Sequence, residues 1–280
     1  TKSTSEMMLV SGYSGIGKSS LVNEVHKPIV RQRGYFISGK FDQFKRNIPY
    51  APLIQAFQSL IGQLLTEDAA FLQGWRDKLL GALGSNGQII VDVIPEVELI
   101  IGKQPEVPQL APNESQNRFN RLFQQFIGVF TRKEHPLVIF LDDLQWADAA
   151  SLKLMQLLIA APESQYLLLI GAYRDNEVSA THPLIQTVEE IQKTGTTVNN
   201  IVLRPLKLTH VHQIINDTLK ETDQVKTQEL ASLLFNKTAG NPFFLTQILK
   251  TLEREKLLTF DFVKGGWEWD IKKIQALGVT

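Results

Sequence analysis

The stretch Gly12-Tyr13-Ser14-Gly15-Ile16-Gly17-Lys18-Ser19 fits the pattern of a glycine, four residues and then Gly-Lys-Ser. Before it, residues 7–10 form an apolar run typical of a buried strand, and after it residues 20–25 place apolar side chains at helical spacing. A strand, a glycine loop and a helix in this order form a phosphate-binding loop, because the glycines let backbone N–H groups point inward and the helix N-terminus attracts an anion. An ordinary glycine turn is the alternative, and both flanks argue against it.

This loop predicts a nucleoside triphosphate site. Lys18 is expected to reach the β- and γ-phosphates, and the Ser19 hydroxyl is expected to bind Mg²⁺. The residues expected to contact the nucleotide here are Gly12, Gly15, Ile16, Gly17, Lys18, Ser19 and Ser20.

A second motif lies where the apolar run 136–141 ends in Asp142 and Asp143. A run of this kind is typical of a central strand buried on both faces. Because Mg²⁺ prefers oxygen ligands, Asp142 at the strand tip is expected to hold the metal, directly or through a water molecule. Asp143 is then placed to orient or polarise the attacking water. Two acidic residues that end a strand by chance are the alternative.

Another strand is predicted over residues 166–172, and Arg174 follows it. We expect Arg174 to sense the γ-phosphate, although an exposed loop arginine is the plainer interpretation. Further strands are predicted over residues 35–38 and 198–203, and helical patterns lie between the strands. The alternation predicts an α/β fold, a parallel five-stranded P-loop NTPase sheet flanked by helices.

The order of the elements predicts three regions. The ATPase core is predicted over residues 1–205, with a helical insertion at about 66–112 to which we assign no function. Residues 206–256 predict a C-terminal helical lid with a break at Gly240-Asn241-Pro242. Residues 257–280 alternate in polarity and predict a hairpin, the start of a truncated winged-helix-like segment whose core partner does not appear before the chain stops.

Composition excludes several classes of function. Hydrophobic residues make up 43% and charged residues 21% of the 280 residues, which is ordinary for a globular protein with a sizeable core. Lys plus Arg equals Asp plus Glu at 29 each, so no bulk attraction to nucleic acid or an anionic membrane is built in. The absence of cysteine excludes disulfides and thiolate metal sites and is compatible with a cytoplasmic location. No apolar run approaches a membrane span, and because the chain begins at Thr1 we expect a segment of a longer protein.

Together these motifs resemble those of STAND-class P-loop ATPases, AAA+-related signal-transduction ATPases with numerous domains. The resemblance rests on the glycine loop, on residues 142–148 (Asp-Asp-Leu-Gln-Trp-Ala-Asp), on Arg174 after Gly-Ala-Tyr, and on Gly-Asn-Pro-Phe-Phe at 240–244. More narrowly, residues 41–43, 140–148 and 172–178 resemble the Orc1-like, AAA_16-type ATPase module of large hybrid signalling kinases. In those proteins the module lies between a serine/threonine-kinase-like domain and GAF and histidine-kinase domains of a two-component system.

The resemblance implies a cytoplasmic switch that binds ATP and hydrolyses it slowly with Mg²⁺. It implies catalytic roles for Lys18, Asp143 and Arg174, metal binding by Ser19 and Asp142, and a place near the adenine for Pro242 in the lid break. The implied partners are ATP and ADP, the flanking kinase and sensor domains of the same chain, and further copies in a nucleotide-dependent assembly, with no nucleic acid expected.

The sequence departs from the family pattern in two respects. The family usually has a Gly-Arg-Glu-type segment just upstream of the first strand that contributes to the adenine pocket, and this sequence begins after it, which puts the nucleotide affinity of this segment in question. No arginine finger is identified, so efficient turnover is not predicted.

Three other functions remain open. A DNA-associated AAA+ ATPase of the replication-initiator type shares the sheet-and-lid plan but needs a basic face and a complete winged helix. A phosphotransferase acting on a small substrate usually carries an arginine-rich lid, whereas residues 250–256 have mixed charges. A nucleotide-holding scaffold would bind ATP and release no phosphate.

Overall fold

The computed structural model describes residues 5–31, 34–45, 48–161, 165–220, 223–263 and 265–276. The chain divides into two compact units: the first comprises Thr1–Ser11 and Ser19–Val202, and the second Gly12–Lys18 and Leu203–Thr280. Residues 1–4 and 277–280, at the ends of the predicted regions 1–205 and 257–280, lie outside the described residues.

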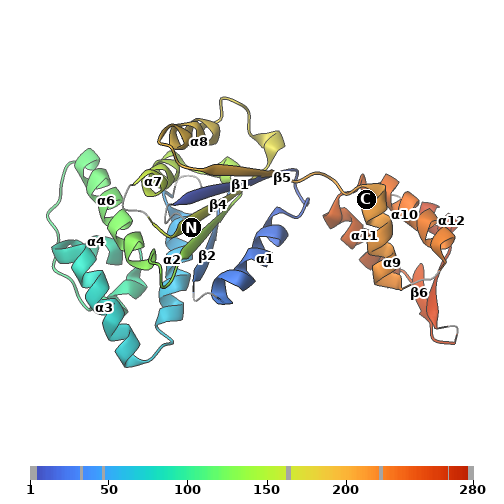
Figure 1. The fold of residues 1–280 in the computed structure, drawn as a ribbon, viewed down its shortest axis with the longest axis horizontal. Coiled ribbons are helices and arrows are strands. Elements are labelled where there is room, and N and C mark those ends of the chain that lie inside the picture. Colours follow the sequence, from blue (N-terminus) through green and yellow to red (C-terminus); the bar gives the residue numbers. More distant parts are fainter. Residues whose placement is uncertain are drawn as a thin grey trace. The chain divides into compact units, whose positions relative to one another are not determined.

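A five-stranded parallel sheet forms the centre of the first unit (Figure 1). Its order is β2-β3-β4-β1-β5. The strands are β1 (Glu6–Ser11), β2 (Tyr35–Lys40), β3 (Leu137–Asp142), β4 (Leu167–Tyr173) and β5 (Val198–Val202). The predicted α/β class and the parallel five-stranded sheet are confirmed.

Helices connect the strands. They are α1 (Lys18–Arg31), α2 (Ala51–Leu64), α6 (Pro112–Phe130), α7 (Ala149–Ala160) and α8 (Pro183–Lys193). The connection from β1 to β2 runs across the sheet in the opposite direction to those from β3 to β4 and from β4 to β5. Because such crossovers are right-handed, α1 covers one face of the sheet, and α7 and α8 cover the other.

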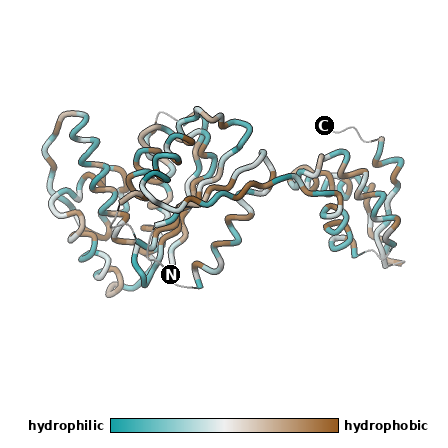
Figure 2. Tube along the Cα trace, turned by 45° about the horizontal axis from the view of Figure 1, so that its top comes forward, coloured by the Kyte–Doolittle hydropathy of each residue, from teal (hydrophilic) through white to brown (hydrophobic). Residues whose placement is uncertain are grey.

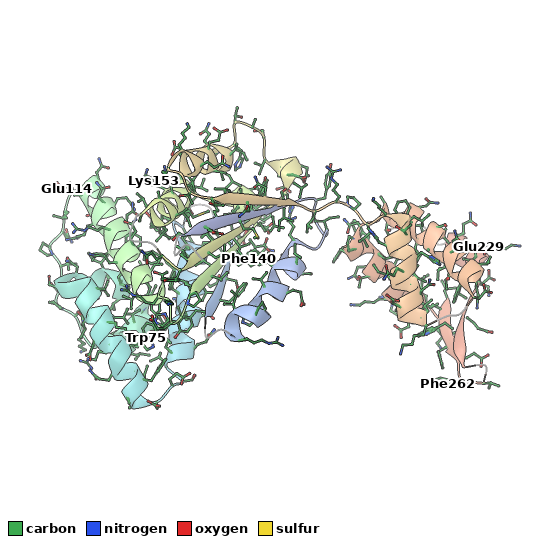
Figure 3. The ribbon with its side chains drawn as sticks, in the orientation of Figure 1. Trp75, Glu114, Phe140, Lys153, Glu229 and Phe262 are labelled. Atoms are coloured by element: carbon green, nitrogen blue, oxygen red, sulfur yellow. The ribbon has the colours of Figure 1, made fainter. Side chains whose placement is uncertain are left out.

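Strand β3 is buried on both of its faces. Along β3, Leu137, Ile139 and Leu141 join the large core, whereas Val138 and Phe140 are buried on the opposite face, because side chains alternate along a strand. Figure 2 shows hydrophobic colouring along the strands, and Figure 3 places Phe140 among them. This pattern agrees with the prediction of a central, doubly covered strand.

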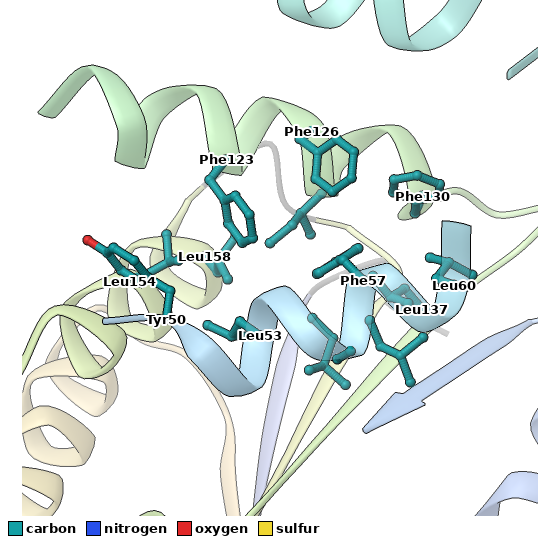
Figure 4. Close-up of a cluster of buried hydrophobic side chains, with 14 of the residues drawn as sticks. Tyr50, Leu53, Phe57, Leu60, Phe123, Phe126, Phe130, Leu137, Leu154 and Leu158 are labelled. Atoms are coloured by element: carbon teal, nitrogen blue, oxygen red, sulfur yellow. The ribbon is translucent and has the colours of Figure 1, made fainter. Parts of the chain in front are cut away.

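An aromatic cluster joins α2 to α6 (Figure 4). Phe57 of α2 lies with its ring centroid 5.8, 5.2 and 5.9 Å from those of Phe123, Phe126 and Phe130. These four side chains are fully buried. Three phenylalanines at helical spacing on α6 thus point toward α2, and their packing holds α6 against α2.

The region of the predicted insertion, about 66–112, consists of short helices and turns. It contains α3 (Ala69–Leu83), α4 (Gly87–Val91) and α5 (Glu98–Ile101), with 3₁₀ turns at Gly84–Asn86 and Pro95–Val97. Pro95 begins a separate turn within this region.

Three helices and a hairpin make up most of the second unit. The helices are α9 (Leu208–Leu219), α10 (Gln224–Thr238) and α11 (Pro242–Arg254), and an antiparallel pair, β6 (Leu258–Asp261) and β7 (Gly266–Trp269), precedes α12 (Ile271–Ala276). Leu258 and Ile274 are buried in one core with Val211, Leu234 and Leu252 of the lid helices. The predicted hairpin therefore has its core partner in the lid helices, contrary to the expectation from sequence. The domain boundaries at 205 and 256 stay a prediction.

A substitution in β4 tests the packing around Gly171. A Cβ on Gly171 would lie 2.3 Å from Leu144 Cδ1 and 3.0 Å from Leu9 Cδ2, both in buried side chains. We expect Gly171→Ala to lower the free energy of unfolding by about 1–3 kcal/mol through overpacking. Urea unfolding measures it, with Gly62→Ala as control, since a Cβ there meets no atom within 4 Å. Equal stabilities of the two variants would contradict this packing.

Candidate nucleotide-binding site

The three strands that lead into the predicted motifs end side by side. In the sheet register Ser11 of β1 pairs with Tyr173 of β4, and Leu141 of β3 pairs with Gly171. Because the strands are parallel, the glycine loop, the acidic pair and Arg174 all follow the same edge of the sheet. In open α/β sheets this carboxyl edge is where ligands bind.

The glycine loop belongs to the second unit and has an unusual backbone. Gly12, Gly15 and Gly17 have φ values of 147°, 74° and 100°, which residues other than glycine rarely adopt. A Cβ on Gly12 would also lie 2.6 Å from the carbonyl oxygen of Leu203. The buried Lys18 ammonium donates to the carbonyl oxygens of Gly12, at 2.7 Å, and Tyr13, at 2.9 Å. These two hydrogen bonds therefore stabilise the conformation of the loop.

The turn at the start of α11, residues 240–243 (the lid turn), contacts this loop directly within the same unit. Asn241 Nδ2 donates to Ser14 O at 2.9 Å, and the Phe243 amide donates to Gly15 O at 3.2 Å. Pro242 lies between these two contacts as the first residue of α11, and the Asn241 side chain caps that helix. The contact of Asn241 with the loop was not predicted from the sequence. The type of this residue and its place before a proline predict a helix start but not the partner.

Ser19 and Asp142 meet in the sheet unit. The Ser19 hydroxyl donates to Asp142 Oδ2 at 2.7 Å, and Asp142 Oδ1 accepts from the Asp143 amide at 2.9 Å. A hydroxyl and a carboxylate in contact are two hard oxygen ligands, which fit Mg²⁺. Among the described residues no group of three His, Cys, Asp or Glu side chains is placed to hold a metal by itself. A metal here therefore needs further oxygen ligands, as phosphates and waters would supply.

Asp143 is buried, with 5% of its surface exposed, and its backbone is left-handed with φ 55°. Its Oδ1 accepts from Gln145 Nε2 at 3.0 Å and lies 3.6 Å from Arg174 Nε, while Lys40 Nζ lies 3.1 Å from its Oδ2. Lys40 reaches it because β2 pairs with β3, with Lys40 opposite Asp142. Two cations and an amide thus hold this carboxylate.

Arg174 is fixed on several sides. Its Nη1 pairs with Glu177 Oε1 at 2.7 Å, its guanidinium lies 4.9 Å from the Trp146 ring centroid, and its amide donates to Gln145 Oε1 at 3.2 Å. The side chain of the predicted sensor, Arg174, is therefore fixed beside Asp143.

Two other residues are predicted nucleotide contacts. Ile16 is buried, and Ser20 is exposed in the first turn of α1.

A pocket of about 530 Å³ opens beside Asp143, Arg174 and Lys40. The segment after β2, including Phe41 and Phe44, forms another wall. The contact of Lys40 with Asp143 was not predicted from the sequence.

The sheet order, the glycine loop after β1, the acidic pair after β3 and the arginine after β4 define a P-loop NTPase of the AAA+ kind. The sequence model of the AAA ATPase domain family matches residues 1–170, and the chain belongs to this family.

Two histidine kinases are similar to this chain over nearly its whole length. Hybrid signal transduction histidine kinase G of Dictyostelium discoideum is 32% identical over 343 residues, covering 100% of this chain and 10% of the kinase. The peroxide stress-activated histidine kinase mak3 of Schizosaccharomyces pombe is 20% identical, covering 97% of this chain and 13% of the kinase. The chain thus spans about a tenth of the length of the curated relatives it matches, and the predicted similarity to a hybrid-kinase segment is confirmed.

Among solved structures, the Aeropyrum pernix ORC2 protein, in ADPNP–ADP complexes, superposes with a TM-score of 0.50 at 13% identity. The match covers 98% of this chain and 60% of that one, and at this identity it supports the fold alone. In the part of the chain that the structure describes, no helix has the length and apolarity needed to cross a bilayer.

Proposed function

We propose that this chain is an ATP-binding, Mg²⁺-dependent switch module of the STAND class that hydrolyses ATP slowly within a multidomain signalling kinase. The observation that carries the proposal is the 2.7 Å hydrogen bond between Ser19 Oγ and Asp142 Oδ2. It joins the start of α1 to the tip of β3, and so brings the two predicted metal ligands together although they are 123 residues apart. Bound Mg²⁺ would neutralise charge on the phosphates.

In this proposal each side chain has a separate task. Lys18 exchanges its two loop carbonyls for phosphate oxygens, which are stronger partners because they are charged. Asp143 accepts the proton of the water that attacks the γ-phosphorus, and ADP and phosphate leave. Arg174 faces the charge of the γ-phosphate. The loop glycines and Ser20 bind the phosphates, and Pro242 lies toward the adenine.

Slow hydrolysis follows from the contacts of Asp143. Both of its oxygens are engaged, by Gln145 and Arg174 on one side and by Lys40 on the other. Because these contacts occupy most of the lone-pair positions of the carboxylate, we propose that the attacking water displaces one of them to reach Asp143. This displacement adds a conformational step to each turnover.

The switch would reach the lid through the loop itself. The carbonyls of Ser14 and Gly15 are bonded to the Asn241–Phe243 turn, so a loop that closes around phosphate changes the partners of the lid turn. Ordering of a segment by a γ-phosphate is a recognised way to couple nucleotide state to the rest of a protein. The kinase and sensor domains of the same polypeptide, and other copies of it, are the proposed receivers.

The same contacts favour a second candidate, a scaffold that holds ATP without hydrolysing it. If Lys40 and Gln145 never release Asp143, ATP binds and no phosphate appears. Steady-state phosphate release measured beside calorimetric ATP binding separates the two: binding with release supports the switch, and binding without it supports the scaffold.

The metal assignment gives a further prediction. We expect Asp142→Asn to raise the Mg²⁺ concentration for half-maximal hydrolysis about tenfold or more, because an amide oxygen binds Mg²⁺ more weakly than a carboxylate. A Mg²⁺ titration at saturating ATP measures this shift. Glu189→Gln, an exposed acid on α8, is the control and should leave the titration unchanged. Identical titrations for Asp142→Asn and the wild type would remove Asp142 from the metal site.

A further inference from the structure

A second cavity lies away from the nucleotide site, between α3 and α6. It has a volume of about 840 Å³ and is lined by residues of both helices together with Thr131, Arg132 and Ala161. Arg132 precedes β3, whose other end carries Asp142, and β3 spans roughly 17 Å at about 3.3 Å per residue. The cavity therefore lies toward the opposite edge of the sheet.

Its charged lining is all of one sign. Lys78, Arg121 and Arg132 line it, and among the residues that the structure describes no Asp or Glu side chain does. All three are exposed, and none has an ion pair within the described ranges. Lys78 is held in place, because its Nζ lies 4.6 Å from the centroid of the Trp75 ring on α3, which Figure 3 labels. In a chain with 29 basic and 29 acidic residues, this is a local concentration of positive charge.

The lining of this cavity, called the groove below, includes two glycines that the packing does not require. Gly81 lies inside α3 and Gly128 inside α6, and a Cβ at either position meets no atom within 4 Å. Glycine within a helix costs about 0.8–1 kcal/mol relative to alanine. The core side of α6 is occupied by Phe123, Phe126 and Phe130, which point toward α2 (Figure 4). The bare backbone at the two glycines lets another polypeptide chain approach closely.

We propose that this groove docks an acidic polypeptide segment, whose carboxylates pair with Lys78, Arg121 and Arg132 and whose backbone lies over Gly81 and Gly128. The volume is that of several residues rather than of one anion. Three cations on a chain without net charge would neutralise too few phosphates to hold nucleic acid firmly. The proposal gives the α3–α6 region an interaction surface separate from the proposed ATP site.

The test uses a fluorescent twelve-residue peptide rich in Glu and Asp, with the matching Gln and Asn peptide as the neutral probe. Anisotropy should report binding of the acidic peptide only, and its affinity should fall as salt rises. The double variant Arg121→Glu with Arg132→Glu should weaken binding about tenfold or more, since each reversal replaces an attraction by a repulsion. The matched control is Lys153→Glu with Lys193→Glu, two exposed cations outside the groove, and it should bind as the wild type does.

A second pair of variants keeps the test independent of charge effects on folding. Gly81→Ala with Gly128→Ala should raise the thermal midpoint and yet weaken peptide binding, whereas Gly74→Ala, on α3 but outside the groove lining, should leave binding unchanged. ATP hydrolysis should stay at the wild-type rate in every variant, so failure here is distinct from failure of the proposed function. Equal binding of both peptides, wild-type affinity in the charge-reversed variant, or stronger binding of a single-stranded oligonucleotide would overturn the proposal.

Discussion

Replacing Lys18 with alanine is expected to lower kcat/KM for Mg²⁺-dependent ATP hydrolysis about 10²–10³-fold, equal to roughly 2.7–4 kcal/mol of transition-state stabilisation. The Lys18 ammonium is buried at the start of α1, and its contacts to Gly12 O and Tyr13 O place it inside the glycine loop. A cation at that position meets the charge that develops on the phosphates. Steady-state phosphate release over a range of ATP concentrations measures the loss.

Part of the loss would come from the loop, because the alanine variant leaves the carbonyls of Gly12 and Tyr13 without the lysine. The thermal midpoint of the variant measures that structural part. Lys153→Ala is the control, since Lys153 is an exposed lysine on α7 that does not line the pocket beside Asp143. A Lys18→Ala variant with wild-type kcat/KM would show that the loop does not bind the reacting phosphates.

Replacing Asp143 with asparagine is expected to lower kcat about 10²–10⁴-fold while ATP still binds. Asparagine keeps the size of the side chain and an oxygen that can accept from Gln145, but it cannot take a proton from water. The neighbouring cations Lys40 and Arg174 lose their shared anion, so the variant also reports how far this carboxylate holds them in place. Single-turnover hydrolysis and calorimetric ATP binding together separate chemistry from binding.

The control for this variant is Asp175→Asn, an exposed acid that directly follows Arg174. It should hydrolyse ATP at the wild-type rate. An Asp143→Asn variant with unchanged kcat would exclude the carboxylate as the proton acceptor. A variant that no longer binds ATP would give Asp143 a structural role instead.

The sheet and the loop could be predicted from sequence because their signals are local. Apolar runs near residues 7–10 and 137–141 mark buried strands by themselves, and the spacing of Gly12, Gly17 and Lys18 marks the loop. The edge at which the motifs meet follows from the general rule that parallel strands point the same way. These parts need no knowledge of which strands are neighbours.

The contacts around Asp143 could not be predicted, because they depend on that knowledge. Lys40 reaches Asp143 only because β2 lies beside β3 in the register that places it opposite Asp142. Asn241 reaches Ser14 across 227 residues of sequence, with no periodicity to indicate it. The burial of Leu258 among the lid helices likewise depends on the tertiary fold and could not be predicted from the sequence. Pairings between distant segments are set by packing, and one sequence does not show them.

The central claim is that Ser19 and Asp142 hold the metal of an ATP molecule bound in the glycine loop. A crystal structure with a non-hydrolysable ATP analogue and Mn²⁺ in place of Mg²⁺ tests it, because Mn²⁺ gives an anomalous signal. The account predicts one Mn²⁺ peak at about 2.0–2.2 Å from Ser19 Oγ, with Asp142 bound directly or through one water, and triphosphate density in the loop. A Mn²⁺ peak and triphosphate located away from Ser19 and Asp142 would contradict it.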